Sequence, residues 1–348
     1  MPKVYTVARA PNSGQSADAF HNAPAPMRRR RQENAAPALT GRRTSKAWKA
    51  ARLFEQMPRW AAIRAARRHR LVSAARGAMV FTMNNREWRL IVDARETGQG
   101  NMLLDEALAV RVAEGHSPPT LRIYAWPCHA ISLGRHQPAA PLLNEERCQD
   151  EGIEIVRRPT GGKAVRHSPG NVTYSVIGRD DAPPMSRDVT RSYATVNQAL
   201  VAGLGILGIR AAVRDPAPLW PETGVDFGCF ESPGRHEIYW AGRKLAAGAQ
   251  RRTGGVILQQ GTIPNTETGA DLAALLCLGP GERERLRRDL TDRTGSLARA
   301  LDDAPDFARA ADALLEGFRR AWGIDVRPAP VTPAEERLMQ RLSQNGRG

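Results

Sequence analysis

The chain has 348 residues, of which 41% are hydrophobic and 25% are charged, so it is long enough for one large domain or two smaller ones. Its formal net charge of +15 would by itself favour a nucleic-acid-binding protein. Residues 1–82 hold 17 of the 51 Lys and Arg residues but only 3 of the 36 Asp and Glu residues. Residues 83–348 therefore hold 34 basic and 33 acidic residues, which is an ordinary globular composition.

Residues 1–82 combine Ala, Arg, Pro and Ser, and few large apolar residues recur there at a regular spacing. Such a composition argues against a packed core. We therefore expect a disordered extension, with Met83 as an alternative start of the protein. An Arg-rich segment that is poor in acidic residues also fits a targeting peptide or an arm that binds nucleic acid.

From Trp88 onward the pattern is that of a folded domain over residues 83–348. The stretch WRLIVD reads as a strand, and NMLLDEALAVRVAEG, which ends at Gly115, has the apolar spacing of a helix. Four β-rich runs punctuated by Gly and Pro follow, at residues 120–126, 130–134, 153–159 and 171–178.

The second half of the chain is predicted to alternate in the same way. We expect a helix over roughly 190–207, a hairpin over 236–250 and a strand over 255–263. From about residue 270 the pattern is helical, most clearly over 305–323. Runs of strands broken by single helices predict an α/β fold of the α+β type, with a mixed sheet flanked by helices.

Four cysteines, Cys128, Cys148, Cys229 and Cys277, are widely spaced, without a C-x-x-C pair or histidines at metal-binding spacing. We therefore expect reduced thiols and no metal site. No secretory signal is apparent, and no apolar run approaches the roughly 20 residues that a membrane span needs. These features predict a cytoplasmic protein that does not bind a membrane.

The segment RRPTGGKAVRHSPGNVTYS, which begins at Arg157, joins two predicted strands. Gly161 and Gly162 allow a ligand to approach the backbone, and Arg157, Arg158 and Lys163 supply positive charge nearby. The composition suits an anion or an acyl carrier group, although Thr-Gly-Gly also forms ordinary turns. It matches neither the P-loop nor the dinucleotide-binding fingerprint.

The predicted hairpin has a lysine fifteen residues after a cysteine. Strand alternation places Lys244 and Leu245 on opposite faces, so Lys244 could point into a cleft beside the loop that carries Cys229. An ammonium beside a thiol lowers the pKa of the thiol and raises the thiolate fraction, as a nucleophile needs. Alternatively Cys229 is a small buried hydrophobic residue, as we expect for the other three cysteines. His167 either orients a substrate or is structural.

The order of these motifs resembles the lipoate- and biotin-protein ligase superfamily. RRPTGGKAV, CFESP, GRKLA and GVILQQGTI follow one another as they do there, and the likeness runs from about Trp88 to about Trp322. It is greatest to the cysteine-dependent protein N-octanoyltransferases. The resemblance implies a ligase-like catalytic domain with a central mixed sheet flanked by helices and a tunnel for a medium-length acyl chain.

The resemblance also implies roles for individual residues. Cys229 falls where these transferases carry the thiol that accepts the acyl group, and Lys244 matches the lysine that lowers the pKa of that thiol. Substrate contacts are implied for Arg157, Arg158, Thr160, Gly161, Gly162, His167, Gly248 and Ala249. Neither a cofactor nor a metal is implied for this reaction.

We therefore predict that octanoyl-acyl carrier protein is the donor and that a lysine of a lipoyl domain or of glycine-cleavage H protein is the acceptor. The transfer would pass through an acyl-thioester on Cys229 as the first step of protein lipoylation. Two alternatives share the fold: an ATP- and magnesium-dependent lipoate-protein ligase, and an amidotransferase acting between the lysines of two proteins. The non-enzymatic alternative is a nucleic-acid-binding protein acting through residues 1–82, which would not need this thiol and amine.

Three positions depart from the pattern of the ligases. Lys163 stands where they carry a third glycine, Ser168 follows His167 in place of an aspartate, and Gln260 stands where a histidine is common. A side chain at the third glycine position crowds a loop that has to approach phosphate. This departure favours the transferase over the ligase.

Overall fold

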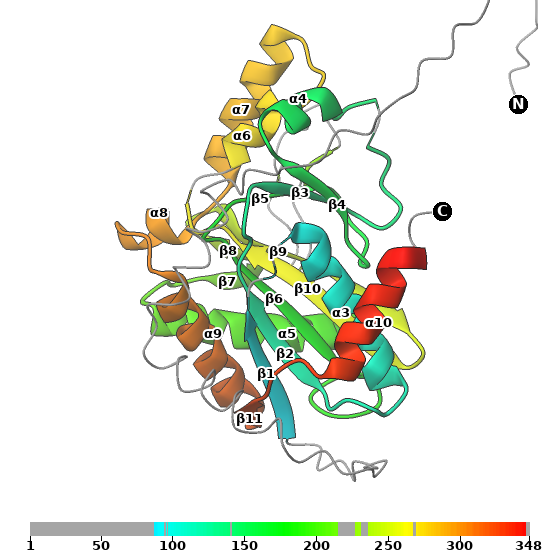
Figure 1. Cartoon of the computed structure of the whole chain (residues 1–348). Coiled ribbons are helices and arrows are strands. Elements are labelled where there is room, and N and C mark those ends of the chain that lie inside the picture. Colours follow the sequence, from blue (N-terminus) through cyan, green and yellow to red (C-terminus); the bar gives the residue numbers. More distant parts are fainter. Residues whose placement is uncertain are drawn as a thin grey trace, which may run out of the picture. The chain divides into compact units, whose positions relative to one another are not determined.

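The computed structural model describes residues 87–93, 95, 97–139, 141–214, 227–230, 236–266 and 269–345 (Figure 1). The predicted extension and the alternative start at Met83 lie outside these residues. In chain order the elements are β1 (Glu87–Asp93), α3 (Gly98–Ala113), β2 (Thr120–Tyr124), β3 (Ala130–Leu133), α4 (Glu145–Asp150), β4 (Glu154–Arg157), β5 (Val165–His167), β6 (Val172–Arg179), α5 (Val189–Ile206), β7 (Ala212–Arg214), β8 (Glu237–Trp240), β9 (Arg243–Thr253), β10 (Val256–Ile263), α6 (Gly269–Ala274), α7 (Pro280–Arg293), α8 (Leu297–Leu301), α9 (Phe307–Trp322), β11 (Asp325–Pro328) and α10 (Pro333–Asn345).

Eight strands of the described chain form one mixed sheet in the order β11-β1-β2-β6-β10-β9-β8-β7. β1 runs parallel to both of its neighbours, whereas every pair from β2 to β7 is antiparallel. Three further strands form a small sheet in the order β4-β3-β5. The predicted fold class, a central mixed sheet flanked by helices, is confirmed.

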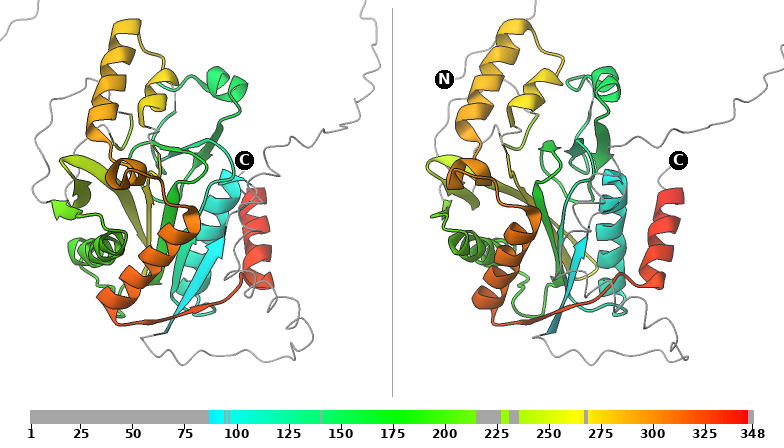
Figure 2. Two further views of the ribbon diagram at one scale, coloured as in Figure 1. Left: turned by 90° about the vertical axis from the view of Figure 1, so that its left-hand side faces the viewer. Right: turned by 60° about the vertical axis from the view of Figure 1, so that its left-hand side comes forward.

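Helices cover both faces of the large sheet. Figure 2 shows α5 and α9 on one side of it and α3 and α10 on the other. On the α5 and α9 side, Leu90 and Val176 join the largest core cluster, which includes Leu314 of α9. On the α3 side, Ile177 packs with Leu104. Neighbouring strand residues thus point to opposite faces, and both faces are apolar because both are covered.

The ends of the two longest helices on the first face are fixed by acidic caps. Asp188 accepts a hydrogen bond from the backbone N–H of Arg191 at the start of α5. Asp306 accepts one from the backbone N–H of Arg309 at the start of α9. Such a cap satisfies one of the backbone donors that a helix start leaves unpaired. α9 ends at Gly323, whose φ of 61° closes the last turn in the left-handed conformation.

The C-terminal part departs in one respect from the predicted run of helices. Residues Asp325–Pro328 form β11, which pairs in parallel with β1 at the edge of the sheet. A four-residue edge strand has too little alternation to be recognised, because its partner decides its conformation. α10 packs against α3, and its Glu335 forms a buried ion pair with Arg89 at 2.8 Å. None of the described helices is long and apolar enough to cross a membrane.

The predicted hairpin is formed by β8 and β9. Its two-residue turn, Ala241 and Gly242, has φ values of 46° and 76°, as a tight turn between twisted strands requires. Tyr239 is paired with Lys244, and the register shifts between Ile238 and Tyr239. The hairpin thereby fixes the position from which the side chain of Lys244 projects out of the sheet.

Candidate active site

A cavity lined by both sheets encloses an empty space of about 420 Å³, part of which is open to solvent. Its walls come from β2, β3, β5, β6, β9 and β10, with Met102 of α3 among them. Cys229 lies at its edge and also lines a second cavity of about 300 Å³, together with Leu272 of α6 and Leu290 of α7. The thiol therefore borders two spaces.

The residues predicted from the sequence divide into those that line the larger cavity and those that support it. The lining residues are Cys229, Arg158, Gly162, His167, Gly248 and Ala249. Lys244 contacts Cys229 without lining the cavity. Arg157, Thr160 and Gly161 likewise do not line the cavity, and each contributes to the loop between β4 and β5.

The thiol and the predicted lysine are in contact. The segment that carries Cys229 is held to Ala164 by two backbone hydrogen bonds, at 2.8 and 2.9 Å. Lys244 Nζ donates to the carbonyl oxygen of Cys229 at 2.9 Å and lies 3.6 Å from its Sγ. The lysine therefore fixes the backbone of the thiol and places an ammonium beside its sulfur.

Lys244 is almost completely buried, with 2% of it exposed, and lies 3.4 Å from a carboxylate oxygen of Glu237. Burial lowers the pKa of Lys244, but the negative charges of Cys229 and Glu237 raise it, and the balance lies above the usual lysine value. Burial raises the pKa of Glu237, and Lys244 offsets part of that rise. The side chain of Lys244 is therefore an ammonium.

Two of the other thiols lie in different electrostatic surroundings. Cys128 is partly exposed, and its Sγ lies 3.6 Å from the carboxylate of Glu154. Burial and this negative charge raise the pKa of Cys128 to about 11. Burial also raises the pKa of Cys148. These two thiols favour the neutral form, whereas the sulfur of Cys229 has an ammonium 3.6 Å away.

The arginines of the loop between β4 and β5 hold its backbone. Arg158 is 7% exposed and donates to the carbonyl oxygens of Gly161 and Lys163 at 2.6 and 2.8 Å. Arg157 donates to the carbonyl oxygen of Gly134 at 2.7 Å. Arg157 and Arg158, which were predicted to contact a ligand, thus bind the backbone of their own loop and of the neighbouring segment. Of these two arginines, Arg158 also lines the cavity.

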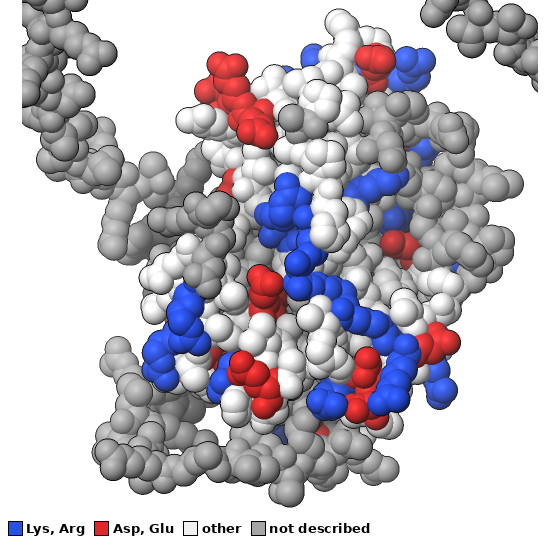
Figure 3. Space-filling view, turned by 90° about the vertical axis from the view of Figure 1, so that its right-hand side faces the viewer, with Lys and Arg blue, Asp and Glu red and all other residues white. Residues whose placement is uncertain are grey.

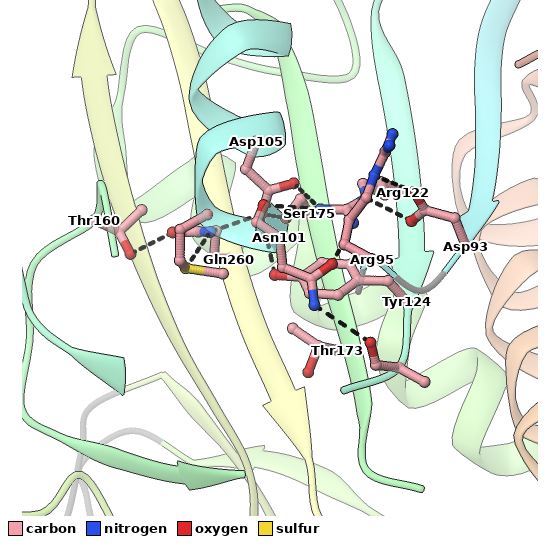
Figure 4. Close-up of polar contacts among 12 residues, drawn as sticks. Asp93, Arg95, Asn101, Asp105, Arg122, Tyr124, Thr160, Thr173, Ser175 and Gln260 are labelled. Carbon is pink, nitrogen blue, oxygen red and sulfur yellow. Dashed lines mark hydrogen bonds and ion pairs between the residues drawn. The ribbon is translucent and has the colours of Figure 1, made fainter. Parts of the chain in front are cut away.

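The same loop is tied to α3 through a buried polar cluster. Thr160 donates to the side-chain oxygen of Gln260 at 2.8 Å, and Gln260 donates to Asp105 at 2.7 Å. Figure 4 shows Gln260 between the two. Asp105 accepts further hydrogen bonds from Arg122, Tyr124 and Ser175. The glutamine that departs from the ligase pattern therefore joins the loop to the core.

His167 forms part of the cavity wall. Its ring stacks on Trp126, with centroids 3.8 Å apart, and its Nε2 lies 2.8 Å from the hydroxyl of Ser132. Burial, followed by the charges of Arg158 and Arg166, lowers the pKa of His167 well below its usual value. The imidazole is therefore neutral and positions the wall rather than supplying charge.

The nucleic-acid-binding alternative rests on residues 1–82, which lie outside the described residues, so only the charge of the described surface bears on it. On the face shown in Figure 3, basic side chains form a band with acidic side chains on both of its sides. Among the described residues, no group of three or more His, Cys, Asp or Glu could hold a metal ion. This face therefore carries mixed charge rather than the single-sign surface typical of nucleic-acid binding.

The family model of the lipoyl protein ligase A/B catalytic domain matches residues 97–319. Octanoyltransferase LipM of Moorella thermoacetica is 35% identical over 257 residues, which cover 73% of this chain and 93% of that protein. Octanoyltransferase LipM of Kyrpidia tusciae is 37% identical over 264 residues, covering 73% and 94%. The chain belongs to the lipoyl protein ligase A/B family. The predicted acyltransferase class is confirmed by the same relatives.

Solved structures of this family have the same fold. A lipoate-protein ligase A bound with ATP superposes with a TM-score of 0.59 at 26% identity, over 74% of this chain and 94% of that one. A bipartite lipoate protein ligase of Thermoplasma acidophilum, solved in a study of its E2 lipoyl domain, gives 0.62 at 23% identity, over 74% and 92%. The predicted superfamily is thereby confirmed.

Part of the surroundings of Lys244 and of His167 was not predicted from the sequence. Glu237 lies on β8 two residues before Tyr239, the partner of Lys244 across the hairpin. An acidic residue close to a lysine across a two-residue hairpin turn could have been predicted to form an ion pair. The contacts of His167 with Trp126 and Ser132 could not be predicted, because these two residues are distant from it in the sequence.

Proposed function

We propose that this protein transfers an octanoyl group from octanoyl-acyl carrier protein to a lysine of a lipoyl domain or of glycine-cleavage H protein, as a step of protein lipoylation. The observation that carries the proposal is the contact between Lys244 and the thiol of Cys229 at the edge of the cavity. Further support comes from the relatives named octanoyltransferase LipM.

In the first half-reaction the thiolate of Cys229 attacks the carbonyl carbon of the donor thioester. A carbon–sulfur bond forms to Cys229, the bond to the carrier sulfur breaks, and the carrier leaves as a thiolate that takes a proton from water. One thioester replaces another, so this step is nearly balanced in free energy. The ammonium of Lys244 stabilises the attacking thiolate.

In the second half-reaction the neutral amine of the acceptor lysine attacks the thioester on Cys229. The amide bond forms, the bond to Cys229 breaks, the sulfur leaves as a thiolate and the amine proton passes to solvent. An amide is more stable than a thioester, so this step runs downhill. Because the donor is already activated, neither ATP nor a metal enters the balance.

The cavity supplies binding energy for the acyl chain. Burial of each CH₂ group contributes about 0.8 kcal/mol, so an octanoyl chain gains several kcal/mol from apolar walls. Met102, Tyr124, Trp126 and Val165 furnish such walls. A covalent intermediate also allows two bulky carrier proteins to use the same site in turn.

The test is intact mass spectrometry of the full chain after incubation with octanoyl-acyl carrier protein alone. We expect one added octanoyl group that hydroxylamine removes, as it does from a thioester. Cys229→Ala should abolish the adduct. Cys128→Ala is the matched control, because Cys128 is also partly exposed but lies beside Glu154, and it should leave the adduct unchanged.

The ligase alternative predicts the opposite pattern. Free octanoate or lipoate with ATP and magnesium would then modify the lipoyl domain, and Cys229→Ala would remain active. Modification in the absence of octanoyl-acyl carrier protein would therefore refute the proposed donor. The amidotransferase alternative is separated by offering an octanoylated H protein as the sole donor.

A further inference from the structure

A third charged side chain completes the contact between Cys229 and Lys244. Glu237 is the first residue of β8, is 8% exposed, and places a carboxylate oxygen 3.4 Å from Lys244 Nζ. We infer that Glu237 is a positioning residue for acyl transfer, whose carboxylate keeps Lys244 protonated and directed at Cys229 in both half-reactions. This inference rests on the proposed function.

The surroundings of Glu237 differ from those of a structural ion pair in the same protein. Glu335 is fully buried, and its two oxygens accept four hydrogen bonds, from Arg89, Ser117 and the backbone N–H of Thr332. The second oxygen of Glu237 is buried and forms no hydrogen bond of ordinary length among the described residues, and the backbone N–H of Gly248 offsets the effect of its burial only in part. A buried carboxylate left in this state costs free energy, so stability alone does not account for it.

The charges in the site change during the reaction. In the resting enzyme Lys244 faces two anions, the thiolate of Cys229 and the carboxylate of Glu237. Once Cys229 carries an acyl group its sulfur is neutral, and Glu237 is the remaining anion beside the ammonium. A buried lysine without a counter-charge tends to lose its proton. The ammonium is needed again when Cys229 leaves as a thiolate, so its charge has to persist through the acyl-enzyme.

Three other titratable groups lie near Glu237 and Lys244: Tyr193 of α5, Tyr174 of β6 and Tyr239 of β8. Tyr239 raises the pKa of Lys244 less than Glu237 does, so Glu237 is the larger source of counter-charge once the thiol is acylated. Burial raises the pKa of Tyr193 and of Tyr174, so both phenols stay neutral. Arg158, which feels the charge of Cys229 from the loop after β4, is itself a cation.

The experiment measures the two half-reactions separately in the full chain. The acyl-enzyme is prepared with octanoyl-acyl carrier protein, freed of donor, and mixed with an excised lipoyl domain from pH 6 to 9. In the unchanged protein the deacylation rate should rise about tenfold per pH unit, because the acceptor lysine, with a pKa of about 10.4, has to lose its proton.

Glu237→Gln keeps the shape of the side chain and removes its charge. We expect deacylation to level off as the pH rises, because each gain in free acceptor amine is offset by loss of the proton from Lys244. At pH 8 deacylation should be about tenfold slower if Lys244 titrates one unit below that pH. Acylation should change much less, because the thiolate itself pairs with Lys244 in the resting enzyme.

Two further variants exclude a merely structural effect. In the Lys244→Arg background the cation cannot lose its proton, so adding Glu237→Gln should leave the tenfold rise per pH unit intact. Glu335→Gln removes the charge of a buried glutamate far from the thiol in the sequence. It should lower stability while leaving the pH profile unchanged.

The outcomes separate this inference from the proposed function. If the unchanged protein forms no acyl-enzyme, the proposed function fails. If the acyl-enzyme forms and Glu237→Gln shows the unchanged pH profile, or if acylation and deacylation fall equally, only the role of Glu237 is refuted. Levelling of the profile in Glu237→Gln, but not when it is combined with Lys244→Arg, supports the inference.

Discussion

Two groups of polar side chains each contribute at least one residue to the cavity wall, and their polar contacts differ. In the scaffold cluster, which consists of Asp105, Arg122, Tyr124, Ser175 and Gln260, both oxygens of Asp105 accept hydrogen bonds of 2.5 to 3.0 Å (Figure 4). In the thiol cluster, which consists of Cys229, Lys244 and Glu237, the ammonium lies 3.6 Å from the sulfur and 3.4 Å from the carboxylate.

The difference relates to whether the charges change during the reaction. The charges of the scaffold cluster are constant, so short and complete hydrogen bonds fix one geometry and join α3 to the sheet. In the proposed reaction the thiol cluster gains and loses a negative charge in every cycle. Lys244 keeps one short hydrogen bond, to the carbonyl oxygen of Cys229 at 2.9 Å, and its longer contacts with the sulfur and with Glu237 allow the same residues to accommodate both states. Substitutions in the two clusters should therefore have opposite effects on stability and on reactivity.

The largest effect is expected from Asp105→Ala. It removes one of the two carboxylates that pair with the buried guanidinium of Arg122, leaving Asp93 at 2.8 Å, and removes the acceptor for three other donors. Breaking a buried ion pair by removing one partner costs about 3–5 kcal/mol. Urea unfolding should show this loss in the free energy of unfolding. A loss below about 1 kcal/mol would mean that the cluster does not hold the core together.

The double substitution Lys244→Met with Glu237→Leu should affect the two properties in the opposite way. Replacing both partners of a buried ion pair by apolar residues often leaves stability nearly unchanged, whereas Lys244→Met alone would leave the buried carboxylate of Glu237 unpaired. At pH 7, however, alkylation of Cys229 by iodoacetamide should slow, because the ammonium 3.6 Å from the sulfur is gone. Peptide mapping measures the rate at Cys229, with Cys277 as the internal control. An unchanged rate would refute the stabilisation of the thiolate by Lys244.

A smaller effect is expected from Gln260→Leu, because Gln260 links the scaffold cluster to the loop at Thr160. The substitution leaves the buried hydroxyl of Thr160 without its acceptor, at a cost of about 1–3 kcal/mol. The alkylation rate of Cys229 should stay the same, because neither Lys244 nor Glu237 contacts Gln260 in the described hydrogen bonds. A slower alkylation rate would instead show that the two clusters act as one functional unit.

Much of the fold could be predicted because the relevant signals are local. The helix at α3, the strand at β10 and the hairpin with its turn at Ala241–Gly242 each have a period or turn chemistry that a single segment specifies. The short strands β5, β7 and β11 could not be predicted, since three or four residues carry too little periodicity. They are strands because a neighbouring strand pairs with them.

The site was predictable to a similar extent. Cys229 and Lys244 were identified because the hairpin brings them together over fifteen residues. The interpretation of Arg157 was less informative, since a positive charge in a glycine-rich segment does not reveal that it binds the carbonyl of Gly134. Asp105 gave no signal, because its partners come from three strands distant in sequence. Burial, rather than residue type, decides these roles.

The smallest expected effect is a dependence of stability on pH through His167, which forms part of the cavity wall. Its pKa is well below the usual value in the folded protein because the ring is buried near Arg158 and Arg166. The unfolded chain takes up a proton near the ordinary value of about 6.5, so below that pH the unfolded state binds more protons and stability falls. Between about pH 6.5 and 5.5 this contributes a loss of about 1 kcal/mol.

His167→Gln should remove this contribution while the remaining pH dependence, to which Glu237 also contributes, persists. The quantity to measure is therefore the difference between the two proteins in their free energy of unfolding at each pH. That difference should change by about 1 kcal/mol over the interval, with the unchanged protein losing more stability as the pH falls. A constant difference would mean that His167 takes up its proton in the folded state as readily as in the unfolded chain. The cavity wall would then tolerate a charge next to Arg158, contrary to a neutral ring stacked on Trp126.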